Sequence, residues 1–165
     1  MLLGLGPVSA SGGESGRTLI VTGASRGIGA AVARLAAAEG YAVAVNYSRD
    51  ASGAASVVDD IRSAGGRAAA IQADISEERN VIDLFEKAVA ELGPLNGLVN
   101  NAGSVGPLCR VADISAAALD EVLRLNVTSV FLCCREAVRR LSTLSGGAGG
   151  SIVNISSRAA VLGGA

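Results

Sequence analysis

The chain has 165 residues and a formal net charge of −1; 50% of its residues are hydrophobic and 18% are charged. This length suits a single domain with a sizeable hydrophobic core. The balanced charge gives no electrostatic basis for binding nucleic acid or an anionic membrane surface. No apolar run reaches the roughly 18 residues of a membrane-spanning helix, so we expect no such helix.

The N-terminal 17 residues predict a flexible tail, because they are rich in Gly and Ser and lack the basic and continuous apolar segments of a secretory signal. Residues 18–165 are expected to form one domain. The three cysteines, Cys109, Cys133 and Cys134, have no C-x-x-C spacing, and the chain has no histidine. This composition excludes a Cys/His zinc site and favours reduced thiols in a cytoplasmic protein.

Strand and helix patterns alternate along the chain. We predict strands over residues 18–22, 41–46, 67–72, 95–99 and 151–155. Between them we predict a helix over 27–39, a second around 54–61, a third from a Ser76 cap to Leu92, and a long helix from an Asp113 or Ser115 cap to about Leu144. This alternation predicts an α/β protein with a Rossmann-type doubly wound parallel sheet, with helices on both faces.

Apolar residues at helical spacing form a stripe along one face of each predicted helix. In the first helix this stripe is Ile28, Ala31, Val32 and Leu35. In the second it is Ala54, Val57, Val58 and Ile61, and in the third Val81, Leu84, Phe85, Ala88 and Leu92. The stripe of the long helix is Leu119, Val122, Leu123, Val127, Val130, Phe131 and Cys134.

A glycine-rich turn joins the first strand to the first helix with the spacing G-x-x-x-G-x-G. Gly23 allows a sharp turn, Gly27 lets backbone approach a pyrophosphate, and Gly29 lets the helix pack closely. Such a turn presents backbone N–H groups and the positive end of a helix dipole to a phosphate. This context favours a phosphate-binding turn over a plain tight turn.

Polar or small residues follow every predicted strand at its carboxyl end, where ligands bind in open α/β sheets. The residues are Tyr47, Ser48 and Arg49 after the second strand, Asp74 after the third, residues 100–103 after the fourth and 156–158 after the fifth. We therefore predict a ligand site along this edge of the sheet.

The end of the second strand favours NADP over NAD. An NAD site needs a carboxylate there for the ribose 2′-hydroxyl, whereas an NADP site needs cations for the 2′-phosphate. The nearby acid is Asp50, and the guanidiniums of Arg49 and Arg26 can clamp a phosphate. The alternative is that Arg49 only pairs with Asp50 on the surface.

Asn126 interrupts the apolar stripe of the long helix. A buried amide costs roughly 1–3 kcal/mol unless it is hydrogen-bonded. Its amide could bind the backbone of Asn100 or Asn101 and hold the helix to the sheet, or it could fix a water near a reacting centre. Periodicity leaves both interpretations open.

Together these motifs resemble the classical subgroup of the short-chain dehydrogenase/reductase family. The family's T-G-x-x-x-G-x-G turn matches residues 22–29, its N-N-A-G motif matches residues 100–103, and the resemblance extends over residues 18–165. It implies cofactor contacts from Gly23, Ser25, Arg26, Gly27, Ile28, Gly29, Tyr47, Ser48, Arg49, Asp74, Ile75, Asn101, Ala102 and Gly103. Among these, it implies that Asp74 bonds the adenine amino group and that Asn101 stabilises the central strand.

The resemblance implies an NADP-dependent oxidoreductase that interconverts a carbonyl and an alcohol on a small molecule, either 3-oxoacyl reductase-like or sugar- or small-alcohol dehydrogenase-like. It implies that Ser157 polarises the substrate carbonyl, with Ser156 as the alternative. It assigns Asn126 to the family's catalytic tetrad as the residue that holds a water of the proton relay. A homo-oligomer, tetramer or dimer, assembled through the long helix is also implied.

One family feature is missing from this sequence, the Tyr-x-x-x-Lys pair. The tyrosines are Tyr41 and Tyr47, and the lysine is Lys87. We therefore expect the N-terminal two-thirds of an enzyme, with the sheet truncated after the fifth strand, an open edge on that strand and an uncovered apolar helix face. Such a chain is expected to be inactive alone. The alternative is a non-catalytic dinucleotide-binding module.

Overall fold

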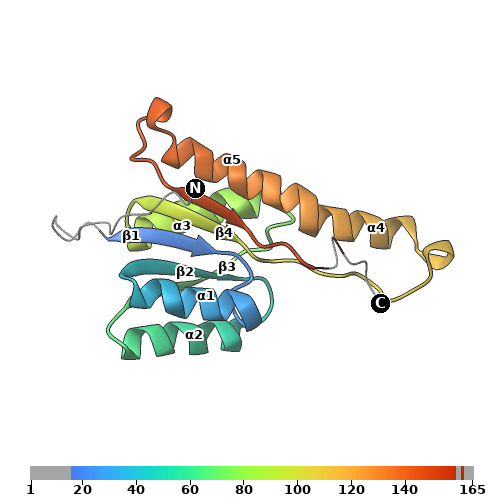
Figure 1. Cartoon of the computed structure of the whole chain (residues 1–165), viewed down its shortest axis with the longest axis horizontal. Coiled ribbons are helices and arrows are strands. Elements are labelled where there is room, and N and C mark those ends of the chain that lie inside the picture. Colours follow the sequence, from blue (N-terminus) through green and yellow to red (C-terminus); the bar gives the residue numbers. More distant parts are fainter. Residues whose placement is uncertain (1–15, 159–160, 162–165) are drawn as a thin grey trace, which may run out of the picture.

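Five parallel strands form one sheet in the computed structural model, which describes residues 16–158 and residue 161 (Figure 1). The strands are β1 (Arg17–Val21), β2 (Tyr41–Tyr47), β3 (Arg67–Gln72), β4 (Leu95–Asn100) and β5 (Ser151–Asn154), in the order β3-β2-β1-β4-β5. Each neighbouring pair is parallel. The sequence prediction of a doubly wound parallel α/β sheet is confirmed.

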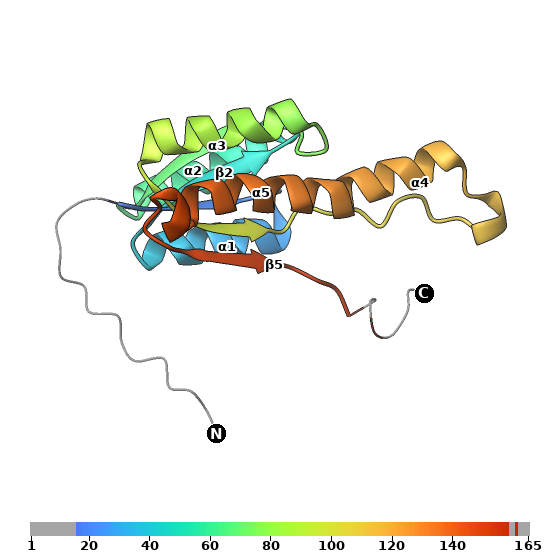
Figure 2. The same ribbon diagram turned by 90° about the horizontal axis from the view of Figure 1, so that it is seen from above.

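Helices cover both faces of this sheet (Figure 2). On one face lie α1 (Gly27–Ala38) and α2 (Ala51–Ser63); on the other lie α3 (Glu78–Leu92) and α5 (Ser129–Leu141). The helix α4 (Ala116–Leu123) and a π-helical turn (Arg124–Thr128) run directly into α5, and two short 3₁₀ turns lie at Val111–Asp113 and Thr143–Ser145. α4 extends past the carboxyl ends of the strands, so it lies beside the edge where a ligand is expected.

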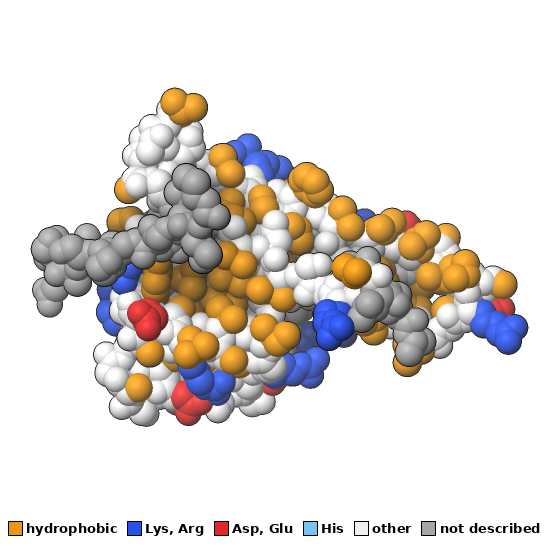
Figure 3. All heavy atoms as spheres, in the orientation of Figure 1, with side chains coloured by type: hydrophobic (Ala, Val, Ile, Leu, Met, Phe, Trp, Pro, Cys, Tyr) orange, Lys and Arg blue, Asp and Glu red, His pale blue; other side chains and the backbone are white. Residues whose placement is uncertain are grey.

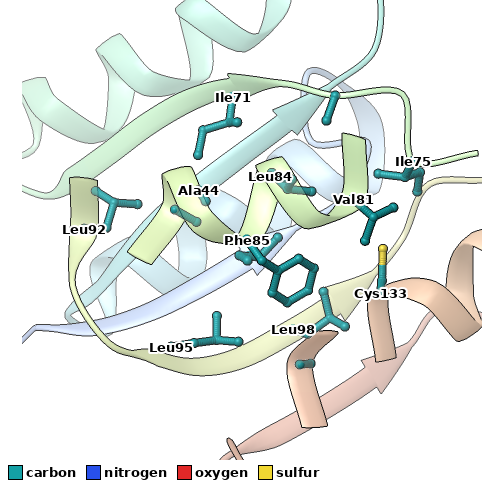
Figure 4. Packing of buried hydrophobic residues seen from close by; sticks show 14 of the residues in the cluster. Ala44, Ile71, Ile75, Val81, Leu84, Phe85, Leu92, Leu95, Leu98 and Cys133 are labelled. Atoms are coloured by element: carbon teal, nitrogen blue, oxygen red, sulfur yellow. The ribbon is translucent and has the colours of Figure 1, made fainter. Parts of the chain in front are cut away.

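Alternating side chains of the strands supply two hydrophobic layers, because successive residues of a strand point to opposite faces. In β2, Ala42 and Ala44 face α3 and α5, whereas Val43 and Val45 face α1 and α2. Phe85 of α3 is fully buried in the first layer, and Figure 4 shows it among the other side chains labelled there. The predicted inward stripes of the second and third helices are confirmed, since every member is buried.

The predicted stripe of α1 is wrong. Ile28 is 63% exposed and Leu35 is 68% exposed, while the buried residues are Gly29, Ala30 and Ala33. The reason is the closeness of this helix to the turn before it, which leaves room only for small side chains on the inner face.

The apolar stripe of the long helix is largely exposed, in agreement with the uncovered apolar helix face expected from the sequence. Phe131 is 74% exposed and Leu123 is 46% exposed. The buried side of α5 instead consists of Ser129, Cys133, Glu136, Ala137 and Leu141. The π-helical turn lies between α4 and α5, and its wider turn interrupts the 3.6-residue period of the long helix.

Two helix ends differ from the prediction and one agrees. Ser76 does not cap α3: Glu77 is the N-cap, and the Ser76 hydroxyl donates to Asp74 Oδ1 at 2.7 Å. Ser115, rather than Asp113, caps α4 by accepting from the Ala118 N–H at 3.2 Å. The long helix ends at Leu141, three residues earlier than expected.

β5 lies at one edge of the sheet, as predicted, and within the described part of the chain it pairs with β4 alone. Val153 of β5 is 48% exposed, and Figure 3 shows hydrophobic side chains spread over the face that carries β5, α4 and α5. Of the predicted tail, residues 1–15 lie outside the described residues, and Arg17 already belongs to β1. None of the described helices is both long and apolar enough to cross a membrane.

Candidate functional site

A cleft of about 1030 Å³ opens at the carboxyl ends of the strands. That volume is at the upper end of the range for small-molecule sites. The cleft is lined by ten of the residues predicted from the sequence: Gly23, Ser25, Arg26, Tyr47, Ser48, Arg49, Asp74, Ile75, Ala102 and Gly103. The other predicted site residues are not in this lining: Gly27, Ile28, Gly29, Asn101, Asn126 and Ser157.

The glycine turn requires glycine for two different reasons. Gly23 and Gly27 have φ of 61° and 58°, which disfavours any side chain. At Gly29 a Cβ would lie 2.5 Å from Asn101 Nδ2 and 2.6 Å from the Gly23 carbonyl oxygen, so no larger residue fits. A Cβ on Gly27, by contrast, would meet no atom of the described residues within 4 Å, so the turn is open on that side.

Asn101 stabilises this turn by hydrogen bonds. Its Nδ2 donates to the carbonyl oxygens of Thr22 at 3.0 Å and Gly23 at 3.1 Å. The Thr22 hydroxyl in return accepts from the backbone N–H groups of Asn101 and Ala102. The end of β4 is thereby joined to the end of β1, which accords with the strand-stabilising role that the resemblance implies for Asn101.

Two guanidiniums, those of Arg26 and Arg49, line the cleft. Arg26 is the N-cap residue of α1 and makes no capping bond with its side chain within the described structure. The carboxylate of Asp50 caps α2 by accepting from the Gly53 N–H at 2.9 Å, and this bond is the main reason that the pKa of Asp50 is lowered. Among the described ion pairs none joins Arg49 to Asp50, so the surface-pair alternative is not observed.

Asp74 lies in the cleft directly after β3. Its Oδ1 accepts from the backbone N–H of Ser76 at 3.0 Å as well as from the Ser76 hydroxyl. These bonds fix the orientation of an exposed carboxylate, whereas the neighbouring Ile75 is buried in the core.

Asn126 lies in the π-helical turn and binds the loop after β4. Its Oδ1 accepts from the Ser104 N–H at 2.9 Å, and its Nδ2 donates to the Ser104 carbonyl oxygen at 2.6 Å. The partner is therefore Ser104 and not Asn100 or Asn101, so this part of the prediction is wrong. The amide holds a loop that lines the cleft, and its assignment to a bound water stays a prediction.

Ser157 follows the end of β5 by three residues and is exposed. The Ile155 N–H donates to the Asn100 carbonyl oxygen at 2.9 Å, which extends the pairing of β5 with β4 toward this serine. The roles of Ser157 and its neighbour Ser156 toward a substrate stay predictions.

Sequence reasoning missed more than half of the lining, including Ser104, Gly106 and Pro107 of the loop after β4, and two further parts of it are informative. One is Asn46, whose signal was a polar residue in an otherwise apolar strand. The other comes from α4 and the turn after it and comprises Ala118, Glu121, Val122, Arg124 and Leu125. Here the guanidinium of Arg124 pairs with Glu77 at 2.9 Å. No local signal in the sequence identifies these residues, because their position depends on how far α4 extends beyond the sheet.

Comparison with known proteins gives concordant matches. A family model described as short chain dehydrogenase matches residues 17–165. The uncharacterized oxidoreductase YgfF of Escherichia coli is 50% identical over 144 residues, which are 87% of this chain and 58% of that protein. Cis-4-hydroxycyclohexanecarboxylate dehydrogenase of Sinomonas cyclohexanicum is 40% identical over 86% of this chain and 55% of its own length.

A solved structure agrees in fold as well as in sequence. A dehydrogenase/reductase from Sinorhizobium meliloti superimposes with a TM-score of 0.81 at 41% identity, over 88% of this chain and 56% of that one. The chain thus spans somewhat more than half the length of the proteins that it matches.

Proposed function

Since this chain belongs to the short-chain dehydrogenase family, we propose that its cleft binds NADP and that the whole protein interconverts an alcohol and a carbonyl by hydride transfer. Members of this family bind NAD or NADP and act on small molecules. The chain spans little more than half of its relatives, so the proposed reaction is that of the whole protein. We expect the 165 residues alone to bind the cofactor without turnover.

The observation that carries this proposal is the glycine turn at the cleft. Asn101 is hydrogen-bonded to the turn, and a Cβ on Gly27 would contact no atom of the described residues. The helix α1 begins at this turn without a side-chain cap within the described structure. Backbone N–H groups and the helix dipole then favour an anion at this point. A dinucleotide pyrophosphate fits such a turn, and the cleft beyond it has room for the remainder of the molecule.

The preference for NADP over NAD rests on the two guanidiniums. Arg26 and Arg49 both line the cleft, where a 2′-phosphate would gain charge-assisted hydrogen bonds. Tyr47 ends β2 without offering a carboxylate, and the carboxylate of Asp50 is used as the cap of α2. Asp50 also lines the cleft, so two guanidiniums face one carboxylate at this end of it, and this balance favours a 2′-phosphate over a ribose 2′-hydroxyl.

When bound, the nicotinamide would supply the hydride. Of this chain's own residues, we assign the Ser157 hydroxyl to donating a hydrogen bond to the substrate carbonyl, and Asn126 to holding the Ser104 loop and a water of the proton relay. The name of the Sinomonas relative, a dehydrogenase of a hydroxyl on a ring, supports the carbonyl–alcohol reaction without identifying the substrate here. A 3-oxoacyl compound and a sugar or small alcohol remain the two candidate substrate classes.

We further propose that the whole protein is a cytoplasmic homo-oligomer. The exposed apolar residues of α4 and α5, Leu119, Leu123, Val127, Phe131 and Val138, support association through this face. The free state of Cys109, Cys133 and Cys134 supports a reducing compartment.

The experiment compares NADPH and NADH by calorimetric titration of the chain. We expect NADPH to bind at least about tenfold more tightly, and Arg26→Ala and Arg49→Ala to weaken NADPH much more than NADH. Arg34→Ala is the matched control, because Arg34 pairs with Asp60 outside the cleft. Tighter binding of NADH, or an equal loss for both cofactors in the variants, would contradict the assignment.

A further inference from the structure

Asn46 is a buried polar residue next to the end of β2, with only 2% of its surface exposed, and it lines the cleft. Its Oδ1 accepts from the Gly23 N–H of the glycine turn at 3.2 Å. Its Nδ2 donates to the carbonyl oxygens of Ala73 at 3.1 Å and Ile71 at 3.3 Å. One amide therefore connects the turn after β1 with the segment that follows β3.

The backbone of Asn46 reinforces the same connection. Its carbonyl oxygen accepts from the Ala24 N–H at 2.8 Å. Two successive N–H groups of the glycine turn, at Gly23 and Ala24, are thus both bound by Asn46. The next two residues of the turn, Ser25 and Arg26, line the cleft. By fixing the backbone of Gly23 and Ala24, Asn46 therefore also restrains the position of these two lining residues.

An asparagine meets the chemical demands of this position closely. The side chain must accept from an N–H on the β1 side and donate to carbonyl oxygens on the β3 side. Leucine has a similar size and could do neither, while aspartate would place a second acceptor against the Ala73 carbonyl oxygen. An apolar residue would satisfy the strand alone, since Ala44, on the same face of β2, is buried in the hydrophobic core.

We propose that Asn46 is a positioning residue for the dinucleotide, holding the phosphate-binding turn and the Asp74 side of the cleft in a fixed relation. Ala73, its partner, immediately precedes Asp74, and both line the cleft. The inference rests on the proposed function, because it presumes that a dinucleotide occupies the cleft. It predicts that the amide contributes to affinity through the two segments that it joins, without being a ligand itself.

The test uses Asn46→Leu with Asn96→Leu as the matched control. Asn96 Oδ1 accepts from the Thr18 N–H at 3.0 Å, so it is an asparagine that joins two strands at the opposite end of the sheet. We expect both variants to lower the urea midpoint of unfolding, but only Asn46→Leu to raise the Kd for NADPH, by about tenfold or more. Asn46→Thr, whose hydroxyl can accept and donate, should recover part of the affinity.

A second measurement does not require binding. Hydrogen exchange of the Gly23 N–H should be faster in Asn46→Leu than in Asn96→Leu at equal global stability. Equal NADPH affinity in Asn46→Leu and the wild type, or an equal loss in both leucine variants, would overturn the inference while leaving the proposed function intact. Absence of NADPH binding by the wild type would instead overturn the proposed function, and the inference with it.

Discussion

Gly29 is the residue at which the local packing is tightest around the turn. A Cβ there would approach the side chain of Asn101 and the carbonyl of Gly23 to within 2.6 Å, closer than atoms can pack. Asn101 donates to that same carbonyl oxygen, so any displacement of the Asn101 side chain would disturb a hydrogen bond that stabilises the turn. The glycine is therefore needed for the shape of the turn and not for a special φ.

We predict that Gly29→Ala lowers the free energy of unfolding by about 1–3 kcal/mol and abolishes measurable NADPH binding. The control is Gly65→Ala, where φ is 84° and a Cβ would meet nothing within 4 Å in the described structure. That variant should lose about 1 kcal/mol of stability through backbone strain and keep its affinity. Urea unfolding and calorimetry measure the two quantities, and intact NADPH binding in Gly29→Ala would refute this account of the turn.

At the scale of single residues, ten of the 23 residues that line the cleft could be predicted from the sequence, because glycines and polar residues at strand ends carry a direct chemical meaning. Gly23, Arg26 and Asp74 are examples, and all three line the cleft. Asn46 could not be assigned, because its significance depends on three strand ends meeting in space. The partner of Asn126 was likewise predicted wrongly, since the course of the loop at Ser104 is not encoded in any local pattern.

Helix faces were predicted well where one regular helix packs on one sheet face, as α2 and α3 do. The buried face was predicted wrongly for α1, whereas the apolar stripe of the long helix is largely exposed, as expected. In α1 the inner face is set by close approach, which favours small residues over the large apolar ones that a periodicity rule selects. In the long helix the π-helical turn at Arg124–Thr128 interrupts the period.

The helices α3 and α5 are joined by a charge cluster that no stripe analysis indicates. Glu136 is 3% exposed, and its carboxylate accepts from Arg139 and Arg140 at 2.8 Å and from Arg135 at 3.2 Å. Arg135 also pairs with Glu78 of α3 at 2.7 Å. Burial by itself would raise the pKa of Glu136, but the hydrogen bonds from Arg140 and Arg135 and the charge of Arg139 lower it overall.

A carboxylate whose pKa is lowered in the folded state stabilises the fold above its unfolded pKa and loses that contribution as the pH falls. We therefore predict that stability declines as the pH falls below about 4.5. Glu136→Gln should cost about 1–3 kcal/mol at pH 7, a cost limited because the Arg partners are partly exposed and screened. It should also make the decline shallower, because glutamine has no carboxyl group to titrate. Urea unfolding of both chains from pH 7 to 3.5 tests this, and parallel pH profiles would show that Glu136 does not contribute.

At the scale of the whole molecule, the fold presents a well-formed cleft beside an incompletely covered sheet. The cleft is lined by residues at the ends of β1 to β4 and in the loops that follow them, together with α4 and the turn after it. β5 lies at the edge of the sheet and is separated from β1 by β4, and exposed apolar residues lie along α4 and α5 (Figures 1 and 3). The proposed dinucleotide site therefore combines the well-packed strands β1 to β4 with an exposed helix, α4.

Mapping NADPH binding on the isotopically labelled chain by two-dimensional NMR tests the central claim most directly. The account predicts saturable shifts of backbone amides around the glycine turn, Arg49, Asp74 and Ala102, with little change at the amino ends of the strands, where Thr18 and Asn96 lie. Shifts that do not saturate, or that concentrate on the apolar face of α5, would contradict the claim that this cleft binds a dinucleotide.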